Sequence, residues 1–383
     1  MDLLSLSSLS VKQNSSSINI GSLSIILFAC YVLFSRVAPF VKTRRFSAQN
    51  GCQPIRARQN VSWFGIFFLR DIIKAIKKKV YLDSLTDRYF AMGYNTYQMT
   101  SFGRRAVFTI DPVNLKTMLS LKSKDYSIGH RPAVMGPLLG RAIFVTDGEE
   151  WSHSRAVLRP SFNKTQVANL NIIESHFQHL LKQLCASVVE GNDTTTVDLQ
   201  ELFLRFTMDS STEFLFRTST NTLTAGDHAF SNAFIYSLRD ISLRLRMGPW
   251  ARFRSTDPKA AESHRICREY VDRYADEALE YRRKIDSGDS KQDDSAVSIL
   301  LKELANATGD REKIRDELLG LLLAGRDTTA SLLSSLFFCL AKKPDIWAKV
   351  REEVSSELPN GQLPTYDQLK SLKYARFCVN ESK

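Results

Sequence analysis

The chain has 383 residues, of which 43% are hydrophobic and 24% are charged. This composition is that of a globular protein long enough for one to three domains, and it excludes a disordered chain, a collagen and a small disulfide scaffold. The formal charge of +11 leaves nucleic acid, an anionic membrane and an acidic protein open as partners.

An uncharged apolar segment near the N-terminus predicts a membrane anchor. Residues 18–34 carry no charge, and as a helix they would span about 25 Å, close to the roughly 27 Å of the endoplasmic reticulum bilayer. Residues 35–80 follow as a basic juxtamembrane linker and amphipathic segment. Because flanking positive charge stays in the cytosol, residues 1–17 are predicted to be a luminal tail. A buried core helix is the alternative for the anchor.

Most of the net charge lies directly after this segment. Between Arg36 and Arg88 there are twelve basic and three acidic residues, a net charge of +9. Such a block suits lipid head groups, whereas a nucleic-acid binder would carry its charge along a groove. The six cysteines show no CxxC pair or regular spacing, which argues against a zinc ribbon and a disulfide framework.

After the linker the periodicity is first strand-like and then helical. Residues 94–101 and 106–110 predict a hairpin, and Asp111 followed by Pro112 predicts the start of a short helix reaching about residue 121. From residue 148 onward, apolar i, i+3, i+4 spacing predicts helices over 149–160, 164–190, 197–219, 227–247, 257–285, 293–305, 311–342, 345–357 and 366–381. The fold class is therefore mainly α with a small β-sheet.

Residues 318–340 are apolar except for Arg326 and Asp327 at the centre. A second transmembrane helix is disfavoured, since each buried charge would cost about 2.5–3.5 kcal/mol at the bilayer midplane. A core helix remains. Its Ala324 and Gly325 allow close approach of a ligand, Asp327 can handle protons, and Thr328 and Thr329 supply hydroxyls, so this stretch is a candidate floor of a ligand pocket. In the structural alternative, Thr328 bonds its own helix and Asp327 pairs with Arg326 or with another basic side chain.

Two other polar pairs stand at helical spacing. Trp151 and Arg155 share one face, and their N–H donors suit a bound carboxylate, although a guanidinium resting on the indole ring is the simpler alternative. His176 and His179 could in principle bind a metal ion. Because no third ligand stands at a recognised spacing, a packing or surface role is favoured for both histidines.

Taken together, these residues resemble the cytochrome P450 superfamily of haem-thiolate monooxygenases. Residues 324–329 read AGRDTT and match the family's (A/G)-G-x-(D/E)-T-(T/S) motif, while Trp151 and Arg155 match its W-x-x-x-R helix. Finer matches to fungal microsomal alkane and fatty-acid hydroxylases are found at residues 51–54, 124–131, 143–148 and 153–162. The resemblance covers residues 18–382 and makes residues 81–383 a cytochrome P450 catalytic domain.

The resemblance implies roles for the residues. Asp327 and Thr328 would be catalytic and deliver protons, while Trp151, Arg155, Ala324 and Gly325 would contact haem b. Electrons would come from NADPH through a cytochrome P450 reductase, and a hydrophobic small molecule, an n-alkane or fatty acid, would be hydroxylated. The protein would be a single-pass endoplasmic reticulum membrane protein with a cytosolic domain and no nucleic-acid partner. Residues 132–142 and 229–250 would be the places to look for substrate contacts.

The resemblance also implies that part of the family's pattern is missing. Glu381 looks like the start of the E-x-x-R motif, and none of the six cysteines stands in an F-x-x-G-x-R-x-C-x-G loop, so the chain offers no axial metal ligand. This predicts a P450 fold lacking its C-terminal part and inactive by itself, because the thiolate is absent. The alternatives are a truncated, non-catalytic anchored protein that binds lipid or a reductase, and a basic nucleic-acid binder.

Overall fold

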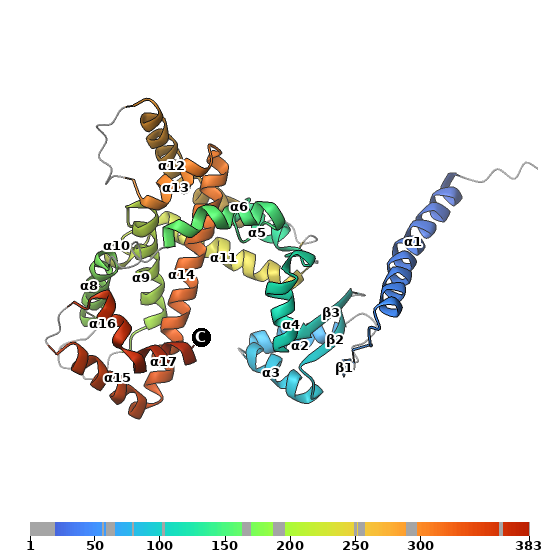
Figure 1. The fold of residues 1–383 in the computed structure, drawn as a ribbon, viewed down its shortest axis with the longest axis horizontal. Coiled ribbons are helices and arrows are strands. Elements are labelled where there is room, and N and C mark those ends of the chain that lie inside the picture. The colour runs from blue at the N-terminus through green and yellow to red at the C-terminus, as the bar shows by residue number, and fades with distance from the viewer. Residues whose placement is uncertain are drawn as a thin grey trace, which may run out of the picture. The chain divides into compact units, whose positions relative to one another are not determined.

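The computed structural model describes residues 20–55, 57–58, 66–78, 80–101, 104–162, 170–186, 196–248, 251, 257–288, 297–359 and 363–382. These residues belong to two compact units, 1–125 and 126–383 (Figure 1). The described elements of the first unit are α1 (Ile20–Gln49), β1 (Ala57–Arg58), α2 (Ile66–Lys77), α3 (Tyr81–Met92), β2 (Thr96–Ser101), β3 (Arg104–Thr109) and α4 (Pro112–Lys116), followed by a π-helical turn, Thr117–Leu121, and a 3₁₀ turn, Ser123–Asp125.

The first helix is longer than the predicted anchor. Residues 18–19 and the side chains of residues 20–29 lie outside the described residues, so the anchor stays a prediction. No helix among the residues that the structure describes has both the length and the apolar character to cross a bilayer. The helix continues past residue 34 to Gln49 and ends before Gly51, which adopts φ 63°, so the first part of the predicted linker is helical.

The small sheet contains the predicted hairpin and one strand that the sequence did not reveal. β2 and β3 pair antiparallel with Thr96 opposite Thr109, and the turn residues 102–103 lie outside the described residues. Tyr97 and Met99 are buried on one face, as the strand period requires. The short strand β1 adds in parallel to β2. Asp111 caps α4 as predicted, accepting from the amides of Val113 and Asn114.

The second unit is almost entirely helical. Its described elements are α5 (Arg131–Leu139), α6 (Gly148–Leu158), a 3₁₀ turn (Arg159–Phe162), α8 (Asn171–Ala186), α9 (Leu199–Phe216), α10 (Thr222–Ala225), α11 (Ala229–Met247), α12 (Pro258–Asp286), α13 (Ile299–Ala307), α14 (Arg311–Ala341), α15 (Pro344–Glu357), α16 (Tyr366–Ser371) and α17 (Lys373–Glu381). The prediction of one continuous helix over 366–381 was wrong. This segment forms two helices, because Leu372 adopts the non-helical ψ of 79°.

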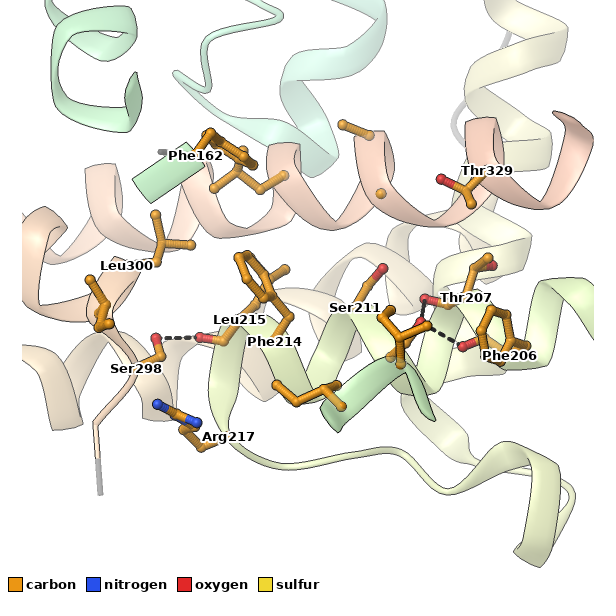
Figure 2. A pocket seen from close by; sticks show the side chains of 17 residues that line it. Phe162, Phe206, Thr207, Ser211, Phe214, Leu215, Arg217, Ser298, Leu300 and Thr329 are labelled. Carbon is orange, nitrogen blue, oxygen red and sulfur yellow. Dashed lines mark hydrogen bonds between the residues drawn. The ribbon is translucent and has the colours of Figure 1, made fainter. Parts of the chain in front are cut away.

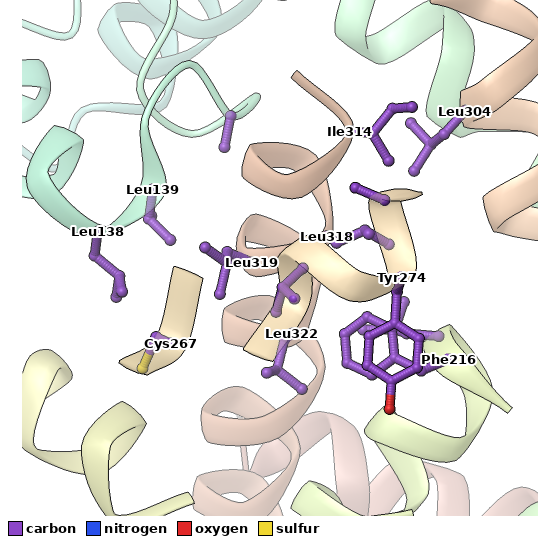
Figure 3. Close-up of a cluster of buried hydrophobic side chains, with 14 of the residues drawn as sticks. Leu138, Leu139, Phe216, Cys267, Tyr274, Leu304, Ile314, Leu318, Leu319 and Leu322 are labelled. Atoms are coloured by element: carbon purple, nitrogen blue, oxygen red, sulfur yellow. The ribbon is translucent and has the colours of Figure 1, made fainter. Parts of the chain in front are cut away.

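The core of this unit surrounds α14, which packs against α9 and α12 (Figure 1). Leu318, Leu319 and Leu322 of α14 are fully buried beside α12 and α5 (Figure 3). Burying one such side chain contributes about 1.5–3 kcal/mol, so this helix is held firmly in place. Leu138 and Leu139 of α5 lie in the same cluster, so these two members of the stretch suggested for substrate contacts instead fill the core.

Candidate functional site

Helix α14 carries the AGRDTT stretch near its middle. Its N-terminus is capped by Asp310, whose carboxylate accepts from the amides of Glu312 at 3.0 Å and Lys313 at 3.2 Å. This cap explains why the helix starts at Arg311, since a capping carboxylate satisfies amides that have no partner within the helix. The prediction of a core helix over 311–342 is confirmed by the helix Arg311–Ala341.

Ala324 and Gly325 line a cavity of about 570 Å³ between α8, α9 and α14 (Figure 2). Its walls are mainly apolar, and Thr329 lines it as well. A Cβ built on Gly325 would lie 2.9 Å from the hydroxyl oxygen of Ser211 on α9. The small residue at this position therefore serves the close packing of α14 on α9, in addition to any role toward a ligand.

Asp327 and Thr328 face a different hollow. They line an open space of about 450 Å³ with Gln200, Leu204 and Ser331. Neighbouring helix positions point in directions about 100° apart, so four consecutive motif residues divide between two faces of α14. The single pocket floor expected from the sequence is thus split, with the small residues on one side and the acid and alcohol on the other.

The two contacts expected if Asp327 and Thr328 serve only the fold are both present. The hydroxyl of Thr328 donates to the carbonyl of Ala324 at 2.6 Å, and Arg326 Nη1 donates to Asp327 Oδ1 at 2.5 Å. The side chain of Arg326 is only 4% exposed, whereas that of Asp327 is 41% exposed. Burial lowers the pKa of the Arg326 guanidinium, while Asp327 and Glu201 oppose this shift.

We expect Asp327→Asn to destabilise the fold. The variant leaves a buried guanidinium without its carboxylate, which costs about 3–5 kcal/mol for a fully buried pair and less here because Asp327 is partly solvated. A loss of about 1–2 kcal/mol on urea unfolding is the expected result. Asp345→Asn provides the control, because this acid in the first turn of α15 has no ion pair within the described ranges. Equal midpoints for both variants would contradict the prediction.

Trp151 and Arg155 lie together on α6. The guanidinium carbon of Arg155 is 5.5 Å from the centre of the Trp151 ring, which is the contact that the simpler alternative describes. Both side chains are exposed. Among the residues that the structure describes, neither the indole N–H nor the guanidinium has a hydrogen-bond partner, so both remain open to a carboxylate.

A buried group of charges positions α6, and sequence reasoning missed it. Lys313 Nζ donates to the carbonyl of Arg141 at 2.6 Å and to the hydroxyl of Ser154 at 2.8 Å, and it lies 2.9 Å from the carboxylate of Glu317. Glu317 also accepts from the amide of Ile143 at 3.0 Å. These bonds join α6, and the turn before it, to α14. The available signal was the i, i+4 pair Lys313 and Glu317.

Asp316 completes this buried group. Its carboxylate accepts from the amide of Arg141 at 2.8 Å and pairs with Arg315 at 2.9 Å. Burial raises the pKa of the Asp316 carboxyl, and the bonds from Arg141 and Arg315 oppose that shift. We call Lys313, Asp316 and Glu317 the buried charge cluster.

The histidine pair has a packing role in the structure. His176 is buried between α8 and α9, and its Nε2 lies 2.7 Å from Glu213 Oε2. The ring of His179 lies 6.0 Å away, edge-on. No group of three potential metal-binding side chains comes together within the described ranges.

Comparison with known proteins gives consistent matches over nearly the whole chain. The sequence model of the family described as Cytochrome P450 matches residues 57–382. "Cytochrome P450 monooxygenase fsdH" of Fusarium heterosporum is 52% identical over 95% of this chain and 64% of its own length. "Cytochrome P450 monooxygenase himC" of Aspergillus japonicus is 47% identical over 90% and 62%. The chain therefore spans less than two thirds of the length of these two relatives.

More distant matches agree. "Cytochrome P450 52A9" of Candida maltosa is 34% identical over 93% of this chain and 70% of its own length. The crystal structure of the "cytochrome P450DA heme domain" superposes with a TM-score of 0.67 at 19% identity, covering 86% of this chain and 69% of that one. At this identity the structural match supports the mainly helical fold alone.

Proposed function

The chain belongs to the cytochrome P450 family, and from this we propose that it is part of a membrane-bound monooxygenase that hydroxylates an n-alkane or a long-chain fatty acid. In this reaction the substrate RH and O₂, with two electrons and two protons, give ROH and H₂O. The electrons would come from NADPH through a reductase at the cytosolic face of the endoplasmic reticulum. The observation that carries the proposal is the family's AGRDTT motif on a core helix, with Asp327 and Thr328 open to one hollow.

Two described residues, Trp151 and Arg155, support the binding of haem. Haem b carries two carboxylates, and Trp151 and Arg155 present exposed donors that have no other hydrogen-bond partner in the described part of the chain. When bound, haem supplies the redox chemistry that activates dioxygen. Trp151 and Arg155 would hold a carboxylate, and the buried charge cluster would keep their helix in position.

Asp327 and Thr328 would handle the protons. The hydroxyl proton of Thr328 is directed to the carbonyl of Ala324, which leaves its oxygen free to accept a hydrogen bond from the open side. Asp327 is partly exposed and can exchange protons with water. An acid next to an alcohol can therefore pass protons from solvent to a reacting group in this hollow.

The substrate class and the location rest on the sequence. Residues 124–131 and 153–162 resemble the alkane and fatty-acid hydroxylases of fungi, and an apolar segment before a basic block suits an anchor in the endoplasmic reticulum. A hydrophobic substrate would be concentrated in the same membrane.

A hydroxylation assay tests this function. It uses membranes that contain a form of the protein with a cysteine ligand for the haem iron, together with NADPH and a reductase. We expect product from an n-alkane or a fatty acid, and Thr328→Val should lower its rate about tenfold to a hundredfold, since it removes the hydroxyl. Thr86→Val is the matched control, because the hydroxyl of Thr86 makes the same i, i+4 bond, to the carbonyl of Leu82, at an exposed position of α3. Equal losses in the two variants, or no product from the unmodified protein, would refute the proposed roles.

The 383-residue chain alone is expected to give no thiolate absorption band after reduction and treatment with carbon monoxide. Cys267 is fully buried in the helical core, so its sulfur is not accessible to a haem iron. Cys185 and Cys339 are exposed, and neither has the sequence of the family's ligand loop. A band at the thiolate position in the purified chain would contradict this prediction.

A further inference from the structure

A small polar hollow lies beside Arg326, and the function proposed above does not use it. Its lining includes Glu201, Arg205, Thr222, Asp227, His228, Asn232 and Arg326. We call this space the polar hollow. Its volume is about 30 Å³, which is room for a water molecule and too little for an organic ligand.

Two buried nitrogen atoms on the lining side chains have no hydrogen-bond partner within the described part of the chain. They are Arg326 Nε and His228 Nδ1. Leaving a buried donor unpaired is unfavourable by about 1–3 kcal/mol, so a water molecule that bonded to these atoms would stabilise them. Burial, followed by the charge of Arg273, lowers the pKa of His228. Its neutral ring then offers one donor and one acceptor, and both suit water.

The charges around the polar hollow balance. Glu201 and Asp227 contribute two negative charges, while Arg205 and Arg326 contribute two positive ones. Arg205 is already paired with Glu201 at 3.0 Å. Neither a free cation nor a free anion is favoured by such a lining, whereas a neutral dipole is.

The wall of the polar hollow is firmly held. On α9 the buried carboxylate of Asp209 accepts from the amides of Thr222 at 2.7 Å and Leu223 at 2.9 Å, and from the hydroxyl of Thr220 at 2.8 Å. These bonds tie α10 to α9. Because buried hydrogen bonds of this kind resist rearrangement, the hollow is not expected to collapse on Arg326.

We propose that the polar hollow binds a water molecule between Arg326 Nε and His228 Nδ1, and that Arg326 is a positioning residue for Asp327. The guanidinium would be hydrated on one side and would hold the Asp327 carboxylate on the other, 2.5 Å from Nη1. Arginine keeps its proton, so Arg326 orients the acid and does not relay protons itself. The positioning role rests on the proposed monooxygenase function, whereas the water site does not.

A crystal structure of the 383-residue chain tests the water site directly. We expect electron density for a water within hydrogen-bonding distance of Arg326 Nε and His228 Nδ1. A dry hollow, or one filled by a neighbouring side chain, would overturn this half of the proposal.

The positioning role is tested in the enzyme that carries its iron ligand. Arg326→Gln is expected to lower the hydroxylated product formed per NADPH oxidised about tenfold. The electrons should then be recovered as H₂O₂, which forms from O₂, two electrons and two protons. Arg326→Lys should recover most of the yield because it keeps a cation near Asp327. The control is Arg265→Gln, which removes an arginine paired with Glu262 and Glu269 on the exposed face of α12.

The outcomes separate the two proposals. If Arg326→Gln lowers only the unfolding temperature and keeps the product yield of the folded enzyme within twofold of the unmodified one, the positioning role is wrong. If the unmodified enzyme makes no product from alkanes or fatty acids, the proposed function and the positioning role both fail. The density in the hollow then decides the water site alone.

Discussion

Replacing Gly140 with alanine is expected to lower stability by about 4–5 kcal/mol, or to prevent folding of the second unit. Gly140 adopts φ 51° and ψ −120°, a conformation that is essentially restricted to glycine. A Cβ at this position would lie 1.9 Å from Asp316 Oδ2. The carboxylate cannot easily move away, because it is buried and bonded to the amide of Arg141 and to Arg315.

Two controls separate backbone strain from overlap, using thermal unfolding followed by circular dichroism. Gly248 has nearly the same conformation, φ 58° and ψ −136°, with nothing within 4 Å of its Cβ position. Gly248→Ala should therefore show the strain alone, about 1–3 kcal/mol. Gly309→Ala, with open space and an ordinary φ, should change little. If Gly140→Ala lowers the stability no more than Gly248→Ala does, the overlap with Asp316 does not contribute to the loss.

Lys313→Met is expected to destabilise the protein by about 3–5 kcal/mol. The methionine fills a similar volume but leaves the Glu317 carboxylate, 2% exposed, without its cation. It also removes the donor that the carbonyl of Arg141 and the hydroxyl of Ser154 use. Since Ser154 lies on the same helix as Trp151 and Arg155, we also expect weaker haem binding in the enzyme that carries its iron ligand.

The double variant Lys313→Met/Glu317→Gln should recover part of the lost stability, because it removes the unpaired charge. Lys284→Met is the matched control: Lys284 pairs with Glu280 at the same i, i+4 spacing and 2.7 Å, but on an exposed surface. That change should cost less than about 0.5 kcal/mol. Similar losses from Lys313→Met and Lys284→Met in urea unfolding would show that burial of the first pair does not matter.

Local signals in the sequence predicted the elements that carry the candidate site. The helix with the AGRDTT motif and the Asp111 cap depend on residues within about four positions of one another, and the hairpin joins two alternating segments through a short turn, so periodicity and capping reveal them. The break at Leu372 and the added strand β1 were not visible in this way. The first is a single backbone angle, and the second is a two-residue pairing with a strand distant in the chain.

Sequence by itself determined that this chain is a mainly helical member of the cytochrome P450 family, and it identified Asp327, Thr328, Trp151 and Arg155 as the residues to examine. Tertiary structure decided how they are arranged. It divided the motif between two faces of α14, buried Arg326 beside Asp327, and joined Gly140 and Arg141 to Asp316 across 175 residues of chain. Such contacts form only when distant segments pack, because no local pattern encodes which buried charge meets which backbone amide.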